Sequence, residues 1–280
     1  MSVIRNRKKF PAIALTILAL IVSVIFVFPI FYLFVSSFKH YVDLVDASRS
    51  FKFLPTLDNY ITTFRKTNFY QIFFNSAIVA LGSISISTAL GVPAAYGLAR
   101  TNLSPKIKRE ISFWFLSMLI LPPVVFVIPM YYFLSSLSLL NTHVGLIIVY
   151  TLFNIPFIVW MMRNYFLSVP REIEEASFLD GCSSLQSLLK VVLPLSLPGL
   201  VASLLFCFVI SWNEFLFAFI FTGAETSTLP KIPRSFVSQQ YLIALGLLFA
   251  QGVLIISPVI VIGVAIQRYF IKGLSFGAVK

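Results

Sequence analysis

Long apolar segments separated by short polar ones dominate this sequence. Runs without Asp, Glu, Lys or Arg cover residues 10–38, 67–99, 111–162, 191–213 and 235–267. A helix needs about 20 apolar residues to cross a bilayer, so each run is long enough for one span. The third run is long enough for two, divided at a polar break over 141–143. The pattern predicts an all-α membrane protein with six spans, at about 13–36, 72–98, 111–134, 144–162, 200–221 and 243–266.

Composition and charge narrow the possible classes further. Of 280 residues, 59% are hydrophobic and 11% charged, and the mean hydropathy of +0.94 excludes a soluble globular protein. The net charge of +11 does not indicate nucleic-acid binding, because the basic residues flank apolar spans and form no stripe with stacking aromatics. Cys182 and Cys207 form neither a disulfide framework nor a metal-binding spacing. The first apolar run is too long for a cleaved signal, so we expect it to be retained as a span.

The basic residues indicate how the spans are oriented. Six spans place both termini on one side, and Lys and Arg concentrate in short loops on the cytoplasmic side. Here they gather before the first span, between the second and third, around the polar insert after the fourth and at the C-terminus: Arg5, Arg7, Lys8, Lys9; Arg100, Lys106, Lys108, Arg109; Arg163, Arg171, Lys190; and Arg268, Lys272, Lys280. We therefore expect cytoplasmic termini and a cytoplasmic insert. The loop over 37–71 then faces outward, and we expect short helices in it.

The polar insert covers 169–198. Pro170 suits the first position of a helix because it lacks an N–H, and acidic residues follow in the first turns. Gly181 can adopt the left-handed conformation that ends a helix, and Ser183 or Ser184 can cap the next one. The insert is therefore predicted to be two short helices joined at an elbow.

Glu214 is the one acidic or basic residue that falls inside a predicted span. Burying its charge is costly unless the group is paired, hydrated or protonated, which favours a functional role. Helical spacing places it on one face with small and polar residues, and such a face usually borders a cavity or another helix. Alternatively, Glu214 lies at the outer interface and pairs with a partner subunit. The candidate pathway-lining residues are Ser203, Cys207, Ser211, Asn213, Glu214 and, in the last span, Gln251.

Other features of the spans predict how they pack. Small residues recur every four positions in the second span, at Ser83, Ser87, Gly91, Ala95 and Ala99. Such a stripe permits close helix contact, which we expect within the chain, with a subunit interface as the alternative. Kinks are expected at Pro93, Pro122, Pro123 and Pro129. His143, in a short turn, is expected to form an interfacial hydrogen bond.

The insert also carries a specific motif. Glu175-Ala176-Ser177 is followed by Gly181, Val191 and Leu193-Pro194 at set spacings. This pattern resembles the EAA loop of permease subunits of binding-protein-dependent ABC importers. The segments GVPAAYGLAR, VPREIEEA, LPLSLPGL and SWNEFLFAF are similar to the carbohydrate-uptake group, and most similar to the smaller permease of maltose-type transporters. Two departures are Ser177 in place of an alanine and the run TLPKIPRSF from Thr228.

The resemblance implies a function and a set of partners. It implies a single permease domain over 1–280 in the inner membrane of a prokaryote, forming half of the path for a sugar, oligosaccharide, polyol or sugar-phosphate-like solute. The implied partners are a second homologous permease, an ATPase dimer, an extracytoplasmic solute-binding protein and membrane lipid. The Glu at the position of Glu175 would pair with a basic residue of the ATPase. The implied ATPase-coupling residues are Glu174, Glu175, Ala176, Ser177, Asp180 and Gly181.

The absence of a nucleotide-binding motif agrees with a permease that works with a separate ATPase. The sequence contains no G-x-x-x-x-G-K-[ST], so ATP would be bound by the partner subunits, and the chain would need no cofactor or metal and be no enzyme by itself. One alternative is a permease for another solute class in the same superfamily. The other is a proton-coupled secondary transporter that uses Glu214.

Overall fold

The chain is helical throughout the part that the structure describes. The computed structural model describes residues 9–232 and 245–275, and every regular element in those ranges is a helix, which confirms the all-α class. Within them, four helices are long and apolar enough to cross a membrane, or up to six if each of two bent helix pairs counts as one span. The described residues group into two compact units, 9–67 with 245–254, and 68–232 with 255–275.

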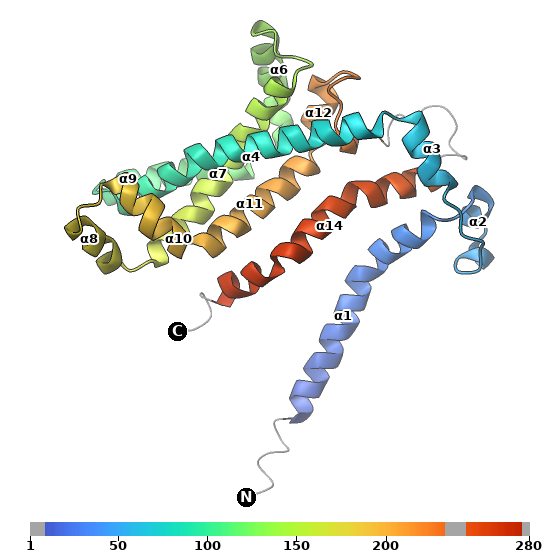
Figure 1. The fold of residues 1–280 in the computed structure, drawn as a ribbon, viewed down its shortest axis with the longest axis horizontal. Helices are drawn as coiled ribbons and strands as arrows, with labels where there is room; N and C mark the ends of the chain where they lie inside the picture. The colour runs from blue at the N-terminus through green and yellow to red at the C-terminus, as the bar shows by residue number, and fades with distance from the viewer. Residues whose placement is uncertain (1–8, 233–244, 276–280) are drawn as a thin grey trace, which may run out of the picture. The chain divides into compact units, whose positions relative to one another are not determined.

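The first unit consists of a long apolar helix and a folded loop. Helix α1 (Lys9–Ser36) contains the first predicted span (Figure 1). The expected short helices of the loop are confirmed as α2 (Tyr41–Val45), η1 (Ala47–Arg49) and α3 (Asp58–Lys66). Helix α14 (Leu245–Ser275) begins in this unit and covers most of the last predicted span, of which residues 243 and 244 lie outside the described part.

A buried lysine holds the loop of the first unit together. The side chain of Lys39 is 1% exposed, and its Nζ donates to the carbonyl of Ser50 at 2.6 Å. The same Nζ lies 5.2 Å from the ring centre of Tyr32 and 5.1 Å from that of Phe53. Aromatic faces and a carbonyl thus replace the water that a buried ammonium group loses.

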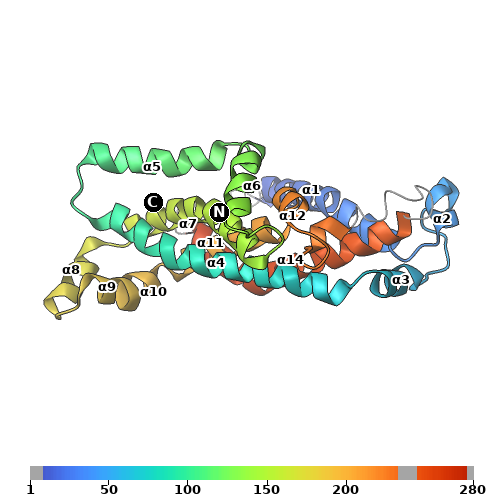
Figure 2. The ribbon, with the colours of Figure 1, turned by 90° about the horizontal axis from the view of Figure 1, so that it is seen from above.

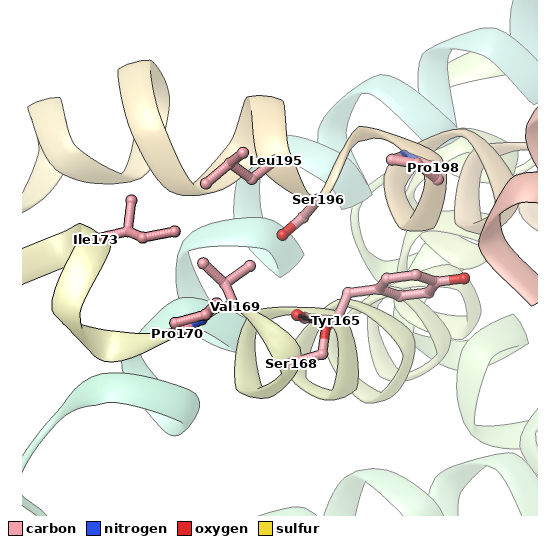
Figure 3. Close-up of a pocket in the computed structure, with 8 residues that line it drawn as sticks. All are labelled: Tyr165, Ser168, Val169, Pro170, Ile173, Leu195, Ser196 and Pro198. Atoms are coloured by element: carbon pink, nitrogen blue, oxygen red, sulfur yellow. Dashed lines mark hydrogen bonds between the residues drawn. The ribbon is translucent and has the colours of Figure 1, made fainter. Parts of the chain in front are cut away.

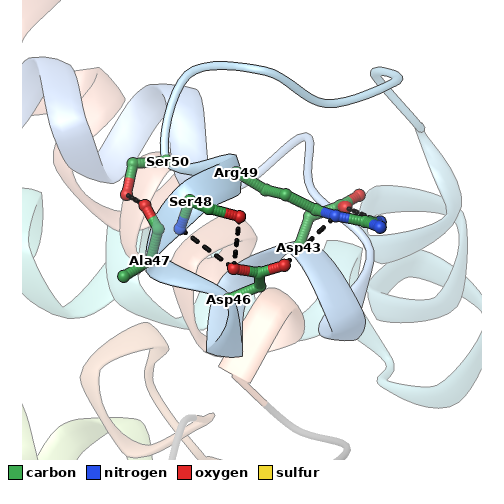
Figure 4. A network of polar contacts seen from close by, with 6 residues as sticks. All are labelled: Asp43, Asp46, Ala47, Ser48, Arg49 and Ser50. Carbon is green, nitrogen blue, oxygen red and sulfur yellow. Dashed lines mark hydrogen bonds and ion pairs between the residues drawn. The ribbon is translucent and has the colours of Figure 1, made fainter.

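A second polar network orders the surface of the same loop. The carboxylate of Asp46 accepts from the backbone N–H and the hydroxyl of Ser48, and Arg49 forms ion pairs with Asp43 and Asp46 at 3.2 Å (Figure 4). The hydrogen bonds from Ser48, followed by the charge of Arg49, lower the pKa of the Asp46 carboxyl. Burial raises the pKa of the Tyr60 hydroxyl, which lies 2.6 Å from Ser37 Oγ. These contacts link α2 to η1 and residue 37, directly after α1, to α3.

The second unit is built on three long helices that pack side by side. These are α4 (Phe69–Arg100), α7 (His143–Ser168) and α11 (Leu197–Trp212) (Figure 1). The small-residue stripe of α4 is buried within the chain, as expected. At Gly91, an added Cβ would lie 2.9 Å from Ile158 Cγ2 on α7, so only glycine permits this approach. His143 Nε2 lies 2.8 Å from Asn75 Oδ1, which confirms its expected hydrogen bond.

The third predicted span is bent much more sharply than a kinked helix. Helix α5 (Pro105–Ile120) ends before Pro122, and η2 (Pro123–Phe126) with α6 (Val127–Ser136) leaves at 97°. Figure 2 shows α6 turned across the direction of α5. The kink expected at Pro122 and Pro123 is therefore confirmed, but the turn separates two helices, because two successive prolines remove two N–H donors and restrict the residue before each.

The fifth predicted span is also broken. Helix α11 ends at Trp212, and the short α12 (Leu216–Phe221) starts after three residues. Its inner side joins a core cluster from α4, α6 and α7, with members such as Val79, Leu134 and Val149. The prediction of one helix over 200–221 was wrong, because the carboxylate of Glu214 binds the backbone N–H groups at the start of α12.

Candidate functional site

The predicted elbow is present between α7 and α11. Helix α8 (Arg171–Leu179) starts directly after Pro170, and Gly181 has a φ of +84°, in the left-handed region that favours glycine. Ser183 then caps α9 (Ser184–Ser187) in a capping box with Gln186. A π-helical segment, η3 (Leu188–Val192), and α10 (Leu193–Leu195) continue the second arm, which meets α11 at 83°.

The predicted coupling residues divide between two sides of α8. The side chains of Glu175, Ala176 and Asp180 are exposed. Glu174 and Ser177 are buried, at 4% and 6% exposure, and face the rest of the chain. Glu174 and Ser177 therefore contribute to the internal structure of the loop. Only four of the six residues implied as coupling residues remain accessible to a partner.

Glu174 lies in a buried polar cluster with the end of α4. Its Oε2 is 2.6 Å from Arg100 Nε, a close charge contact that lies off the hydrogen-bond direction, and its Oε1 accepts from the Tyr96 hydroxyl. Arg100 Nη2 also donates to the carbonyl of Val169 at 2.7 Å, just before α8. The cytoplasmic loop predicted from the sequence is thus attached to α4 through side chains as well as to α7 through the chain.

Ser177 joins the two arms of the elbow. Its Oγ lies 2.8 Å from Ser187 Oγ on α9 and 2.6 Å from the carbonyl of Glu174. An alanine here, as in the EAA motif, would lack this hydroxyl. The serine that departs from the motif therefore adds a hydrogen bond that fixes the angle between the arms.

The base of the elbow encloses an apolar cavity of about 200 Å³. Figure 3 shows its lining, which comes from the end of α7, the start of α8 and the junction of α10 with α11: Tyr165, Ser168, Val169, Pro170, Ile173, Leu195, Ser196 and Pro198. The cavity therefore leaves a space between the two arms at the point where they join the long helices.

A second site lies where α5 and α11 are broken. A cavity of about 90 Å³ is lined by Pro123, Tyr150, Phe153, Asn154, Ile210, Ser211, Glu214 and Phe217. Tyr150 donates to Glu214 Oε2 at 2.7 Å, and Asn154 Nδ2 donates to Ser211 Oγ at 2.9 Å. Glu214 Oε1 and Oε2 accept from the N–H groups of Phe217 and Ala218, at 3.0 and 3.1 Å. These bonds and the partial positive charge at the start of α12 stabilise the negative charge of the Glu214 carboxylate.

The structure brings together only some of the predicted pathway residues. Ser211 and Glu214 line the cavity, whereas Ser203 and Cys207 are buried in α11 outside it. Asn213 is exposed and donates to the carbonyl of Val209 on its own helix. Gln251 belongs to the first unit, is 1% exposed, and has no hydrogen-bond partner for its amide among the described residues.

Sequence reasoning missed several residues of both sites. Tyr150 and Asn154 come from α7, and Tyr96 and Arg100 from the end of α4. Asn154 could have been found, because it is a polar residue within a predicted span. Arg100 was interpreted only as an orientation signal, and nothing local in the sequence links it to Glu174.

Comparisons with known proteins identify permeases of ABC transporters as relatives of this chain. The family described as "Binding-protein-dependent transport system inner membrane component" matches residues 87–276. A probable ABC transporter permease protein of Sinorhizobium fredii is 34% identical over 93% of this chain and 92% of its own length. The sulfoquinovosyl glycerol transport system permease protein SmoH of Agrobacterium fabrum is 33% identical over 90% of this chain and 88% of its own. The diacetylchitobiose uptake system permease protein NgcG of Streptomyces coelicolor is 30% identical over 98% and 90%.

The fold is also found among solved structures. A chain from a bacterial ABC transporter involved in the import of the acidic polysaccharide alginate superposes with a TM-score of 0.72, covering 95% of this chain and 98% of that one at 24% identity. With its helical bundle, its elbow after α7 and its match over 87–276, the chain belongs to the family of binding-protein-dependent transport system inner membrane components, the permeases of ABC importers.

Proposed function

We propose that this chain is the permease subunit of an ATP-driven importer for a sugar or a sugar derivative. In this proposal it is a single permease domain in the inner membrane of a prokaryote, with both termini and the elbow in the cytoplasm. It forms half of the translocation path and couples to a separate ATPase through α8. The basic residues near the elbow end of the second unit support the orientation.

The observation that carries the coupling proposal is the division of α8 into two faces. Glu174 is held inside the chain by Arg100 and Tyr96, which fixes the rotation of the helix about its axis. With that rotation set, Glu175 projects outward without an ion pair among the described residues. An exposed carboxylate on a rigidly held helix suits a basic residue of an ATPase cleft.

The cavity at the helix breaks supports a shared translocation path. About 90 Å³ holds roughly three water molecules and is far below the roughly 300–1,000 Å³ of ordinary ligand pockets. A sugar therefore needs space that a second, homologous permease or a rearrangement supplies. Hydroxyl, amide and carboxylate groups beside aromatic rings suit a ligand rich in hydroxyl groups. The names of the relatives from Agrobacterium and Streptomyces support the same solute class.

The loop after α12 and the start of α4 support a partner outside the membrane. Asn75 Nδ2 donates to the carbonyls of Glu225 and Ser227, and Leu229 N donates to Ser76 Oγ. The loop after α12 is therefore tied firmly to the start of α4. In this proposal it presents a fixed surface to an extracytoplasmic solute-binding protein.

Purification of the tagged chain from gently solubilised native membranes tests the function. We expect an ATPase and a second permease to co-purify, and sugar uptake after reconstitution to require ATP and to resist uncouplers. Recovery of this chain alone, with transport that an uncoupler stops and Glu214→Gln abolishes, would instead establish a proton-coupled carrier.

A further inference from the structure

A basic groove lies between α5 and α7, away from both sites described above. It has a volume of about 500 Å³, and its lining is Pro105, Lys108, Arg109, Ser112, Phe113, Leu116, Trp160 and Arg163. The residues from α5 recur at helical spacing, so they share one face, and Trp160 and Arg163 are one turn apart on α7. Figure 2 shows α5 running along the outside of the second unit.

The charges of the groove have no ion-pair partners in the part of the chain that the structure describes. Lys108, Arg109 and Arg163 take part in none of the ion pairs found within residues 9–232 and 245–275. Arg163 Nε is buried and has no hydrogen-bond partner in the same part of the chain. The nearest acidic residue along α5, Glu110, is exposed and does not line the groove. A buried donor without an acceptor is costly, so the groove favours an anionic occupant.

The two ends of the groove differ in chemistry. Its basic side chains come from the start of α5 and the last turns of α7, at the elbow end of the unit. Phe113 and Leu116 lie further along α5, and both are exposed apolar side chains. Trp160 has an amphipathic ring of the kind that settles at headgroup level. Cations beside an apolar strip match a molecule with a charged head and a hydrocarbon tail.

We propose that this groove binds one anionic phospholipid. Lys108, Arg109 and Arg163 hold its phosphate, and an acyl chain lies along Phe113 and Leu116. Basic pockets between membrane helices on the cytoplasmic side are suited to anionic headgroups. The assignment to the cytoplasmic leaflet rests on the proposed function, whereas the chemistry of the site does not. The bound lipid would brace α5 against α7, the helix that leads into the elbow.

Native mass spectrometry of the full-length chain in a neutral detergent tests this site. The probes are phosphatidylglycerol, phosphatidylcholine with the same acyl chains, and inorganic phosphate. We expect one phosphatidylglycerol to bind at least tenfold more tightly than phosphatidylcholine, and phosphate alone to bind far more weakly because it lacks the tail. Equal binding of the two lipids would overturn the proposal, and phosphate that binds as tightly as phosphatidylglycerol would make the site a free-anion site.

Charge-removing variants connect the binding to these residues. At about fivefold per basic residue, Lys108→Gln/Arg109→Gln should weaken phosphatidylglycerol binding roughly 30-fold, and adding Arg163→Gln should bring the loss to roughly 150-fold. The matched control, Lys52→Gln/Arg65→Gln/Lys66→Gln, removes three exposed cations from the loop of the first unit and should leave binding within twofold.

The lipid site and the proposed importer function can be tested separately. Equal losses in the groove variants and the control would overturn the site. Because lipid binding is measured on the chain itself, failure to recover an ATPase would refute the proposed function and leave the lipid result standing.

Discussion

Glu174 and Glu175 are neighbours in the sequence, but we expect neutralisation of Glu174 to destabilise the elbow and neutralisation of Glu175 to leave its stability unchanged. The side chains of Glu174 and Arg100 are only 6% and 9% exposed. Glu174→Gln leaves the Arg100 guanidinium buried without its counter-charge, and breaking a buried pair in this way costs about 3–5 kcal/mol. At 1.4 kcal/mol per tenfold, a cost of about 3 kcal/mol raises the population of α8 detached from α4 about 100-fold.

Hydrogen exchange of the purified chain measures that population. The hydrogen-bonded amides from Asp180 to Cys182, at the end of α8, should exchange about 100-fold faster in Glu174→Gln, while amides in the middle of α7 remain unchanged. Glu175→Gln is the matched control and should stay within twofold of the wild-type rate, because its side chain is exposed.

The double variant Arg100→Gln/Glu174→Gln separates loss of the ion pair from general damage. It removes both charges, so the buried site no longer contains an unpaired ion, and much of the lost protection should return. If Glu174→Gln and Glu175→Gln exchange at the same rate, the ion pair does not hold α8, and our reasoning about the loop is refuted.

Three further predictions concern local features of the fold. Gly181→Leu should leave membrane insertion intact and abolish ATP-driven uptake. The left-handed φ of residue 181 costs a leucine about 1–2 kcal/mol, so the backbone of the elbow should shift. Normal uptake by this variant would exclude the coupling role. Gly91→Ala should lower the thermal midpoint in detergent through overpacking of about 1–3 kcal/mol, whereas Gly97→Ala on the same helix, with open space around its Cβ, should not. Glu214→Ala should lower the free energy of unfolding by about 1–2 kcal/mol, because it removes the acceptor for the N–H groups at the start of α12. Glu214→Gln keeps an acceptor and should cost less. An unchanged thermal midpoint in Glu214→Ala would contradict the capping role.

The sequence predicted the elements whose causes are local. The helical class, the position of the elbow and a serine cap at Ser183 or Ser184 follow from hydrophobic run length, from Gly181 and from capping chemistry, and the structure has the cap at Ser183. The small-residue stripe of α4 was also predicted to pack within the chain, and the contact of Gly91 with Ile158 shows how.

The breaks in the third and fifth spans could not be located from hydropathy. Helices α5 and α6 together are apolar enough to count as one span. The predicted fifth span is also mostly apolar, so hydropathy shows neither break. Pro122 and Pro123 predicted a kink, but the 97° turn also depends on the core into which α6 packs. At Glu214, the same carboxylate that suggested a buried functional charge is the group that starts a new helix.

The Glu174 cluster was hidden for a different reason. Arg100 and Glu174 are far apart in the sequence, and each had a sufficient local explanation, as an orientation signal and as part of the motif. Only the packing of α4 beside the elbow brings them together. The motif therefore singled out Glu175 for the ATPase but gave no sign that Glu174 is buried.

Retention of the ATPase by the tagged chain tests the central proposal, that the exposed face of α8 couples to a separate motor. Wild type, Glu175→Arg and the control Glu225→Arg, an exposed carboxylate in the loop after α12, would be purified in parallel with a non-hydrolysable ATP analogue. We expect Glu175→Arg to lose the ATPase while keeping the second permease, and Glu225→Arg to keep both. Full retention of the ATPase by Glu175→Arg would contradict the proposal.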